Sequence, residues 1–263
     1  MKIPVGVFGA GGRMGSTVCR AVADDEDLEL VAAVDPFHAG IDLRAVTGAD
    51  IRGVQVSSDS DALERAGAEV AIDFTNIDAA LENLVWCADH GVHAVVGTTG
   101  FRPDDYEELA KRFTACNCFI APNFAIGAVL MMRFAELAAP YFESAEIVEL
   151  HHDQKLDAPS GTAVLTAERL AAASPDWGSD PTEKESLEGS RGAVGPGGIR
   201  VHAVRLRGLV AHQEVLLGTT GQSLTIRHDS YDRSSFMPGV LLAVKAVPSR
   251  PGVTVGLDDL LDL

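Results

Sequence analysis

A glycine-rich turn between a strand and a helix, close to the start of the chain, constrains the fold more than any other feature. The apolar run Ile3 to Phe8 predicts a buried strand, and the stretch Ser16 to Ala23 predicts a helix. Between them lies Gly9-Ala10-Gly11-Gly12-Arg13-Met14-Gly15. Glycines here allow a tight turn and let a pyrophosphate approach the helix N-terminus. The order strand, glycine turn, helix therefore predicts the first unit of a dinucleotide-binding fold.

The spacing of the glycines departs from G-x-G-x-x-G, because Met14 occupies the place of the third glycine. Gly12 and Gly15 supply a shifted G-x-x-G-x-x-G instead. A glycine turn alone also suits simple packing of a helix on a strand. The next predicted strand, Leu28 to Val34, ends at Asp35, twenty residues after Gly15. An acidic residue there accepts hydrogen bonds from ribose hydroxyls, which favours nucleotide binding.

Strands and helices continue to alternate along the first half of the chain. This order predicts an α/β fold with a Rossmann-type parallel sheet. Thr98, Thr99 and Asn123 follow strands, at the sheet edge where open α/β sheets bind ligands. The two threonines are also compatible with a purely structural turn. The predicted strands are Glu69 to Phe74, His93 to Gly97 and Cys118 to Pro122, and the predicted helices are Ala80 to His90 and Pro103 to Thr114.

The pattern changes after Ile126, where strands cluster behind two helices. Such clustering predicts a second, smaller α+β domain. We therefore predict a dinucleotide-binding domain from residues 1–123 and 237–263, and a second domain from residues 124–236. The predicted elements of the latter are the helices Gly127 to Ala139 and Gly161 to Ala172, the strands Ser144 to Leu150, Ile199 to Leu206, Ala211 to Leu217 and Gln222 to Ser230, and the loop Ser174 to Gly198. The helix Pro238 to Val247 is expected to return to the first domain.

The segment Glu149 to Ala163 carries the most chemistry. Its strand leads into a loop with His151, His152 and Lys155, which together suit proton transfer. Ser160 is the predicted N-cap of the following helix, which places backbone N–H groups of the first turn beside these cations. Such a helix end binds carboxylates. A single His or Lys would be an ordinary residue, but the chain has only five lysines, so the cluster favours a functional role.

The charge of the chain excludes some partners. Its 263 residues include 38 Asp and Glu against 21 Lys and Arg, a net charge of −17. Nucleic acid and anionic membranes need basic patches, so neither is an expected partner. A small anionic ligand fits only where cations gather, as they do around Lys155. The acidic excess and the scarcity of Lys also favour a protein from a halophile, with an ordinary acidic cytosolic protein as the alternative.

The sequence indicates a cytoplasmic protein without a structural metal. Its four cysteines lie in apolar segments and form no C-x-x-C pair, which predicts buried thiols in a reducing compartment. The strand that follows Met1 leaves no room for a signal peptide. The uncharged stretch Phe113 to Met132 has the length of a membrane span. Because Pro122 and Gly127 interrupt it, we expect a strand, a turn and a helix instead.

Taken together, these segments resemble the dihydrodipicolinate reductase family over nearly the whole chain. Sugar dehydrogenases and homoserine dehydrogenases share the glycine turn but not the last of these motifs, which is long and specific. The resemblance rests on Val7 to Gly15, Ile72-Asp73-Phe74-Thr75, Val96 to Phe101, Ala121-Pro122-Asn123-Phe124 and Glu149 to Ala163.

The resemblance implies an oxidoreductase of diaminopimelate and lysine biosynthesis, active as a homotetramer. It implies that residues 124–236 form the substrate-binding and oligomerisation domain. Its reaction would be reduction of the cyclic imine derived from 4-hydroxy-tetrahydrodipicolinate, a small dicarboxylate, by NADH or NADPH. It implies that His151 donates or accepts a proton and that Lys155 donates one. The implied substrate-binding residues are His152, Ser160, Gly161 and Thr162. The implied cofactor-binding residues are Gly9, Ala10, Gly11, Gly12, Arg13, Met14, Asp35, Gly97, Thr98, Thr99, Ala121, Pro122, Asn123 and Phe124.

Two other functions are compatible with parts of the sequence. One is a different imine- or carbonyl-reducing enzyme, such as an amino-acid dehydrogenase. The other is a non-catalytic nucleotide sensor, which leaves His151, His152 and Lys155 unexplained. The cofactor is also open, because the family often places a basic residue after the acidic one, where this chain has Pro36. Asp35 favours NADH, whereas Arg13 could reach the 2′-phosphate of NADPH.

Overall fold

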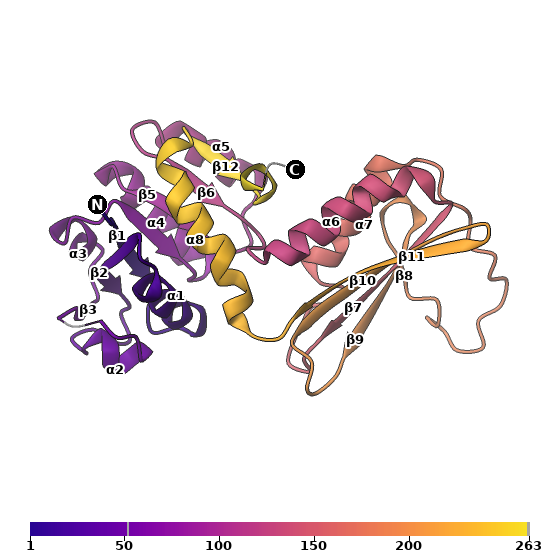
Figure 1. Cartoon of the computed structure of the whole chain (residues 1–263), viewed down its shortest axis with the longest axis horizontal. Helices are drawn as coiled ribbons and strands as arrows, with labels where there is room; N and C mark the ends of the chain where they lie inside the picture. The colour runs from indigo at the N-terminus through magenta and orange to yellow at the C-terminus, as the bar shows by residue number, and fades with distance from the viewer. Residues whose placement is uncertain (52, 262–263) are drawn as a thin grey trace. The chain divides into compact units, whose positions relative to one another are not determined.

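The computed structural model describes residues 1–51 and 53–261 and divides the chain into two compact units (Figure 1). The first unit comprises Met1–Phe124 and Phe236–Leu263, and the second comprises Ala125–Ser235. These junctions lie one residue from the domain limits expected from the sequence. Residues 52, 262 and 263 of the expected first domain lie outside the described residues.

The first unit is built on a seven-stranded sheet with the order β12-β6-β5-β4-β1-β2-β3. All of its strand pairs are parallel, and β1 lies between β4 and β2. The predicted Rossmann-type sheet is therefore confirmed. Its strands are β1 (Ile3–Phe8), β2 (Leu28–Val34), β3 (Val56–Ser57), β4 (Val70–Asp73), β5 (His93–Val96), β6 (Cys118–Ile120) and β12 (Val253–Val255).

Helices surround this sheet, and the strands between them are buried because they are apolar on both faces. Phe8, Ile72 and Phe119 are at most 1% exposed. Helix α4 begins where the Asn76 side chain accepts a hydrogen bond from the backbone N–H of Ala79, and it ends at Gly91 in the left-handed conformation. The helices are α1 (Arg13–Asp24), α2 (Leu43–Thr47), α3 (Asp61–Arg65), α4 (Ile77–His90), α5 (Pro103–Arg112) and α8 (Met237–Ala246), with short 3-10 turns at Val247–Ser249 and Asp258–Leu260. A further 3-10 turn, Arg233–Phe236, spans the junction with the second unit.

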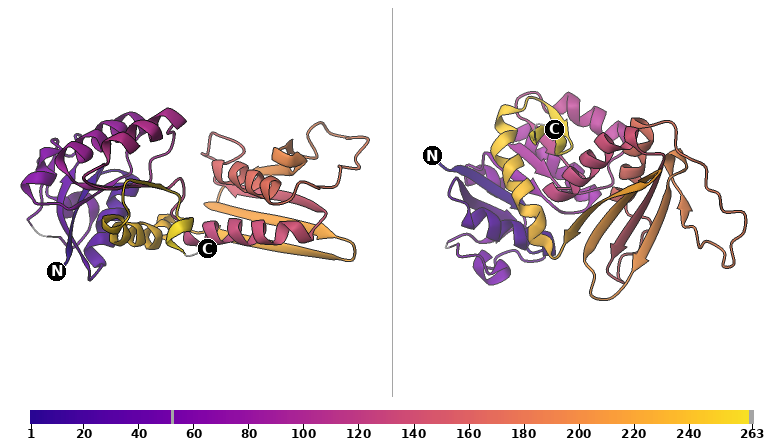
Figure 2. Two further views of the ribbon diagram at one scale, coloured as in Figure 1. Left: turned by 90° about the horizontal axis from the view of Figure 1, so that it is seen from above. Right: turned by 45° about the vertical axis from the view of Figure 1, so that its right-hand side comes forward.

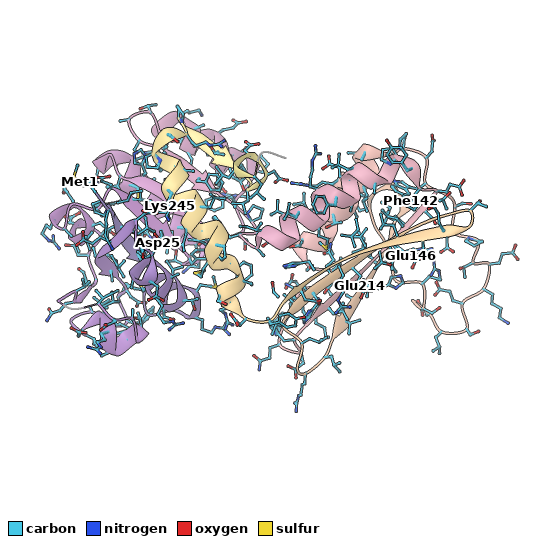
Figure 3. The ribbon with its side chains drawn as sticks, viewed as in Figure 1. Met1, Asp25, Phe142, Glu146, Glu214 and Lys245 are labelled. Carbon is cyan, nitrogen blue, oxygen red and sulfur yellow. The ribbon has the colours of Figure 1, made fainter. Side chains whose placement is uncertain are left out.

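The C-terminal segment completes the first unit, as the sequence predicts for its last helix. Strand β12 pairs with β6, and α8 packs against α1 (Figure 1). Lys245 on α8 fixes this position, since its Nζ lies 2.9 Å from Asp25 Oδ2 and 2.7 Å from Asp27 Oδ2, just beyond the end of α1 (Figure 3). Residues more than two hundred positions apart in the chain therefore share one core.

The second unit is a five-stranded mixed sheet with two helices on one face. The strand order is β11-β10-β7-β9-β8, with β7 antiparallel to β10 and parallel to β9. Figures 1 and 2 show α6 and α7 side by side over this sheet. The strands are β7 (Ser144–His151), β8 (Ala193–Val194), β9 (Arg200–Arg205), β10 (Ala211–Thr219) and β11 (Gln222–Ser230), and the helices are α6 (Ile126–Ala138), α7 (Gly161–Ala173) and the 3-10 turns Ala139–Tyr141 and Pro196–Gly198. The predicted second α+β domain is thus present.

The structure also tests the predicted loop of the second domain and the possible membrane span. The predicted loop Ser174 to Gly198 contains β8, whose two exposed residues give no alternating pattern in the sequence. The apolar stretch Phe113 to Met132 is divided between β6, a turn and α6. Across residues 1–51 and 53–261, the helices are all too short or too polar to cross a membrane.

Candidate active site

The glycine turn after β1 is a close contact between backbone segments. A Cβ atom on Gly15 would lie 2.0 Å from the carbonyl oxygen of Gly9, and Gly9 itself has φ +68°. The backbone N–H of Gly12 donates to the same Gly9 oxygen over 2.9 Å, and α1 begins directly afterwards. Gly15 therefore performs the close packing that a third glycine usually provides. Gly12 and Arg13 are exposed at this helix end, whereas Ala10 is buried.

Asp35 is tied to the glycine turn from the end of the neighbouring strand. It is 5% exposed, and its Oδ2 accepts the backbone N–H of Gly11 over 2.9 Å. Its Oδ1 accepts the backbone N–H of Phe37 over 2.9 Å, and His38 Nδ1 lies 3.1 Å from the same oxygen. A carboxylate held in this way beside a glycine turn has the place of a ribose ligand in dinucleotide-binding folds.

Asp73 organises the next two strand ends, a role that the sequence analysis did not assign. It is 2% exposed and accepts the hydroxyl protons of Thr75 over 2.7 Å and Thr98 over 3.0 Å. The side-chain amide of Asn83, on α4, donates to its other oxygen over 2.7 Å. Asp73 thereby fixes the position of the Thr98 side chain. The signal in the sequence is a carboxylate that ends an otherwise apolar strand.

The remaining predicted cofactor residues of the first unit differ in what they can offer. A Cβ on Gly97 would lie 1.9 Å from a ring carbon of Phe74, so only glycine fits there. Ala121 and Phe124 are at most 1% exposed, which leaves only their backbone for a ligand. The ring of Phe124 packs in the core, 5.8 Å from that of Phe74. The side chains of Met14 and Asn123 are partly exposed, and those of Thr99 and Pro122 are exposed.

In the second unit, the end of β7 is organised by the buried carboxylate of Glu149. This side chain is 0% exposed. Its Oε2 lies 2.6 Å from His151 Nδ1, and both of its oxygens accept hydrogen bonds from the guanidinium of Arg205, over 2.8 and 2.9 Å. The backbone N–H of Ser160 donates to its Oε1 over 3.0 Å. Arg205 lies on β9, in a strand-like run without any motif, so the sequence did not reveal it.

Helix α7 begins as the sequence predicts. The Ser160 hydroxyl accepts the backbone N–H of Ala163 over 3.2 Å, which makes Ser160 the N-cap. Gly161 is exposed, and a Cβ added there would meet nothing within 4 Å. Thr162 is partly exposed in the same turn. The N-terminal end of α7, which carries partial positive charge, therefore has open space at Gly161.

Lys155 lies in the loop between β7 and α7, paired with a carboxylate. Its Nζ lies 2.8 and 2.9 Å from the two oxygens of Asp157, and its side chain is 21% exposed. Its backbone N–H donates to the carbonyl of His152 over 3.2 Å. The exposed ring of His152 accepts the backbone N–H of Gln154. The structure thus places His151 at the end of β7, where the sequence analysis expected a loop, and Lys155 in the loop that follows. It adds Asp157, which the sequence analysis did not assign.

The protonation states of Glu149 and His151 follow from their contacts. Burial raises the pKa of Glu149, but hydrogen bonds from Arg205 and His151 outweigh it and hold the pKa below its usual range. Burial lowers the pKa of His151, and Glu149 only partly offsets this. Because an ionised carboxylate accepts hydrogen bonds only, the Nδ1 of His151 must carry the proton. Its Nε2 therefore has a free lone pair near neutral pH.

One cavity of the second unit lies away from this loop. It has a volume of about 420 Å³ and is lined by the start of β7 and by Trp177, Arg191 and Arg200. Its charges are already paired, with Arg191 bound to Glu146 and Arg200 Nη2 2.7 Å from Asp180. Neither His151 nor Lys155 lines it. Across the described residues, no group of three or more His, Cys, Asp or Glu side chains is placed to hold a metal ion.

A parallel sheet with a glycine turn and a ribose-type carboxylate, together with a proton-handling loop in a second unit, defines a two-domain nicotinamide-dependent oxidoreductase. Comparison with known families agrees with this class. The model of the dihydrodipicolinate reductase N-terminus matches residues 3–124, and that of the C-terminus matches residues 127–261. The chain belongs to the dihydrodipicolinate reductase family.

Individual relatives support the same assignment over the full length. The 4-hydroxy-tetrahydrodipicolinate reductase of Cutibacterium acnes is 52% identical over 268 residues, covering 99% of each chain. That of Nocardia farcinica is 52% identical over 273 residues, covering 100% of each. A dipicolinate-bound dihydrodipicolinate reductase from a Paenisporosarcina species has a TM-score of 0.85 at 42% identity, covering 98% of this chain and 99% of its own.

A more distant structure shows the fold alone. The amine dehydrogenase of Mycobacterium smegmatis has a TM-score of 0.67 at 16% identity. The predicted enzyme class is confirmed: the chain is an NAD(P)H-dependent reductase, and its family places it in the diaminopimelate route to lysine.

Proposed function

We propose that the chain reduces the cyclic imine derived from 4-hydroxy-tetrahydrodipicolinate to tetrahydrodipicolinate. The observation that carries this proposal is the loop between β7 and α7, which joins His151 and Lys155 to the open helix end at Gly161. A dicarboxylate substrate needs cations and N–H donors, and this loop supplies both in a chain of net charge −17. The dipicolinate bound to the Paenisporosarcina relative is a molecule of this type.

Each residue of the loop has a role in the proposal. Hydride addition to a conjugated imine moves negative charge toward the ring nitrogen, which then takes up a proton. The ammonium of Lys155 stabilises that charge and donates the proton, and His151 accepts or returns a proton at Nε2. The ring of His152 and the first turn of α7 at Gly161 and Thr162 bind the substrate carboxylates. Ser160 acts by holding this turn, because its amide and hydroxyl are both used inside the protein.

Asp157 has a place in the same scheme. In the structure its carboxylate accepts hydrogen bonds from the Lys155 ammonium. A substrate carboxylate near Lys155 competes with this exposed residue, whose hydrogen bond with Lys155 lowers its pKa. We expect the ion pair to open when substrate binds, since an ion pair with an exposed carboxylate is worth little.

The residues of the first unit fit a dinucleotide, which supplies the hydride. The close contacts of Gly15 with the Gly9 backbone and of Gly97 with the Phe74 ring leave no room for side chains, and Asp35 is positioned beside the turn. We propose that the cofactor contacts are Gly9 to Met14, Asp35, Gly97 to Thr99, and Ala121 to Phe124. The last segment would contribute backbone groups, because the side chains of Ala121 and Phe124 are buried.

We further propose that NADH is accepted at least as well as NADPH. Asp35 places an anion at the ribose, and Pro36 adds no charge to offset a 2′-phosphate. Comparing kcat/KM for the two cofactors at one salt concentration tests this. A preference for NADPH of about tenfold or more would mean that the exposed guanidinium of Arg13 overrides Asp35.

A single assay separates the proposed reaction from its rivals. The protein is mixed with NADH and enzymatically generated substrate, and the nicotinamide absorbance is followed. We expect rapid loss of absorbance that depends on the substrate. Loss of absorbance only when a 2-oxo acid and ammonia replace this substrate would indicate an amino-acid dehydrogenase. Cofactor binding with no turnover would indicate a nucleotide sensor.

Assembly as a homotetramer and a cytoplasmic location complete the proposal. Helices α6 and α7 cover one face of the five-stranded sheet, and Leu224 and Val194 are exposed on its outer strands, at 38% and 66%. A partner subunit on this sheet would bury them. All four cysteines are free and buried, which suits a reducing compartment. Sedimentation analysis tests the tetramer, and a monomer with full activity would contradict it.

A further inference from the structure

The buried carboxylate of Glu149 has no part in the reaction steps above. Burying an ionised carboxylate is costly unless its oxygens are fully paired. Glu149 meets this condition with four hydrogen bonds of 2.6 to 3.0 Å, from His151, Arg205 and the backbone of Ser160. Glu149 therefore acts as a fixed anion at the base of the loop.

The partners of Glu149 come from three elements that carry different parts of the site. His151 ends β7, Arg205 ends β9, and Ser160 caps α7. Arg205 also donates to the carbonyl oxygen of Asp157 over 2.6 Å, inside the loop that holds Lys155. One carboxylate thus joins the histidine to the helix end and, through Arg205, to the loop of the lysine.

The contact of Glu149 with His151 fixes both the orientation of the imidazole ring and the nitrogen that carries its proton. The charged groups that face His151 are Glu149 on its own strand, Lys155 in the loop and Arg205 on β9. Only Glu149 can accept the Nδ1 proton, since the other two are donors. The Nε2 atom is then the one free to exchange a proton.

We propose that Glu149, held by Arg205, is a positioning residue that fixes the Nδ1–H tautomer of His151 and the start of α7. The Nε2 atom of His151 is consequently the atom that exchanges the proton. This inference rests on the proposed role of His151 and extends it. A glutamine in place of Glu149 keeps the shape but brings an amide N–H₂ toward donors, which favours the opposite tautomer of His151.

A second carboxylate on β7 provides a matched control. Glu146, labelled in Figure 3, also binds one arginine and one histidine. Arg191 is paired to its Oε1, and His202 Nε2 lies 2.8 Å from its Oε2. It lies at the other end of the strand and is 32% exposed. Glu146→Gln therefore removes the same kind of charge from the same strand without touching His151.

The test compares Glu149→Gln, Glu149→Asp and Glu146→Gln as full-length protein. We expect Glu149→Gln to lower kcat by about 100-fold, as for a wrongly protonated catalytic histidine, with the KM for NADH nearly unchanged. Glu149→Asp keeps the anion and should recover part of the loss. Glu146→Gln should stay within about threefold of the wild type. Equal losses in Glu149→Gln and Glu146→Gln would overturn the proposal.

Two readouts separate positioning from a general loss of structure. In protein labelled with ¹⁵N-histidine, the wild type should show His151 protonated at Nδ1, and Glu149→Gln should show it protonated at Nε2. Because Glu149 raises the pKa of His151, its loss should also move the limb of the pH profile that reports His151 to lower pH. If Glu149→Gln fails to fold, the labelled wild type still decides, since an Nε2–H tautomer there contradicts the proposal.

The same data distinguish this inference from the proposed function. Absence of imine reduction by the wild type would refute the function while leaving the tautomer measurable. Normal turnover of His151→Gln would refute the role of His151, and with it the consequence drawn for Nε2.

Discussion

The two units of the molecule build their sites from different materials. In the first unit, the site consists of backbone contacts at glycines and of carboxylates that are bonded to backbone or hydroxyl groups, such as Asp35 and Asp73. In the second unit, it consists of charged side chains paired with one another, with Glu149, Arg205 and Lys155 at its centre. Steric fit therefore dominates the site of the first unit, and ion pairing dominates that of the second.

This difference explains why one site is common to many proteins of this fold and the other is specific to one family. A site made of backbone and glycine is a property of the fold, and the fold is found in an amine dehydrogenase at 16% identity. A site made of particular side chains depends on each residue of one segment. The segment from Glu149 to Ala163 therefore carried the resemblance to a single family, whereas the glycine turn indicated only a dinucleotide-binding fold.

The largest expected effect comes from the charged site. Lys155→Met and His151→Gln should each lower kcat by about 100-fold or more, the scale of a lost proton donor, while leaving NADH binding nearly unchanged. Steady-state kinetics and a fluorescence titration with NADH measure the two quantities. Lys111→Met, on the surface of α5, is the control and should resemble the wild type. A Lys155→Met enzyme within a factor of a few of the wild type would refute its role.

The glycine site should respond in the opposite way. In Gly15→Ala the new methyl group meets the Gly9 carbonyl, so the turn must shift, at a cost of about 1–3 kcal/mol. We expect the KM for NADH to rise by about tenfold or more. Gly218→Ala, where the Cβ meets only the Ser144 hydroxyl at 3.0 Å, is the control. An unchanged KM for NADH in Gly15→Ala would mean that the turn does not bind the cofactor.

The salt dependence of activity tests the charge of the whole chain without any mutation. The acidic excess of 38 Asp and Glu over 21 Lys and Arg should make assembly and activity depend on screening. We expect a loss of activity by about threefold or more in dilute buffer, with partial dissociation of the oligomer. Light scattering and rate measurements across a salt series check this. A fully active, intact oligomer in dilute buffer would contradict adaptation to high salt.

The smallest effect is a difference in acid stability. Glu149 and Glu146, both in the second unit, have pKa values held below their usual range, in both cases because hydrogen bonds from arginine and histidine outweigh burial. A lowered pKa stabilises the fold above the unfolded-state pKa, and this contribution is lost as pH falls through the folded-state pKa. The second unit should therefore lose stability between about pH 5 and pH 3, less so in Glu149→Gln.

Tryptophan fluorescence can follow this difference, since each unit has one tryptophan, Trp86 in the first and Trp177 in the second. Urea unfolding of Trp86→Phe and Trp177→Phe at each pH reports the two units separately. An identical acid dependence for Glu149→Gln and the parent protein would show that this carboxylate is not responsible.

Local patterns made the long elements predictable and left the short ones unseen. Strands β1, β2 and β11 have the predicted limits, because apolar runs and turn residues bound them. Helices α2 and α3 have five residues each, too few for a helical period to appear in the sequence. Strand β3, with two residues, gives no period either.

The candidate site was predictable only where its residues are neighbours in the chain. His151, Lys155 and Ser160 occur within one motif, and Ser160 is the N-cap that the sequence indicated. The bond between Glu149 and Arg205 spans 56 positions and depends on the pairing of β7 with β9. Sequence spacing carries no information about such a pairing, because it is decided by the sheet as a whole.

The placement of β12 and α8 has a consequence for how the protein is made. Strand β6 obtains its outer neighbour only from Val253–Val255, and α1 obtains part of its packing only from α8. While a ribosome still holds these residues, β6 is the edge of an incomplete sheet, and such edges promote aggregation. The second unit, by contrast, is complete in sequence at Ser235 and is free to fold before synthesis ends. The first unit, although it begins first, is therefore the last to be finished.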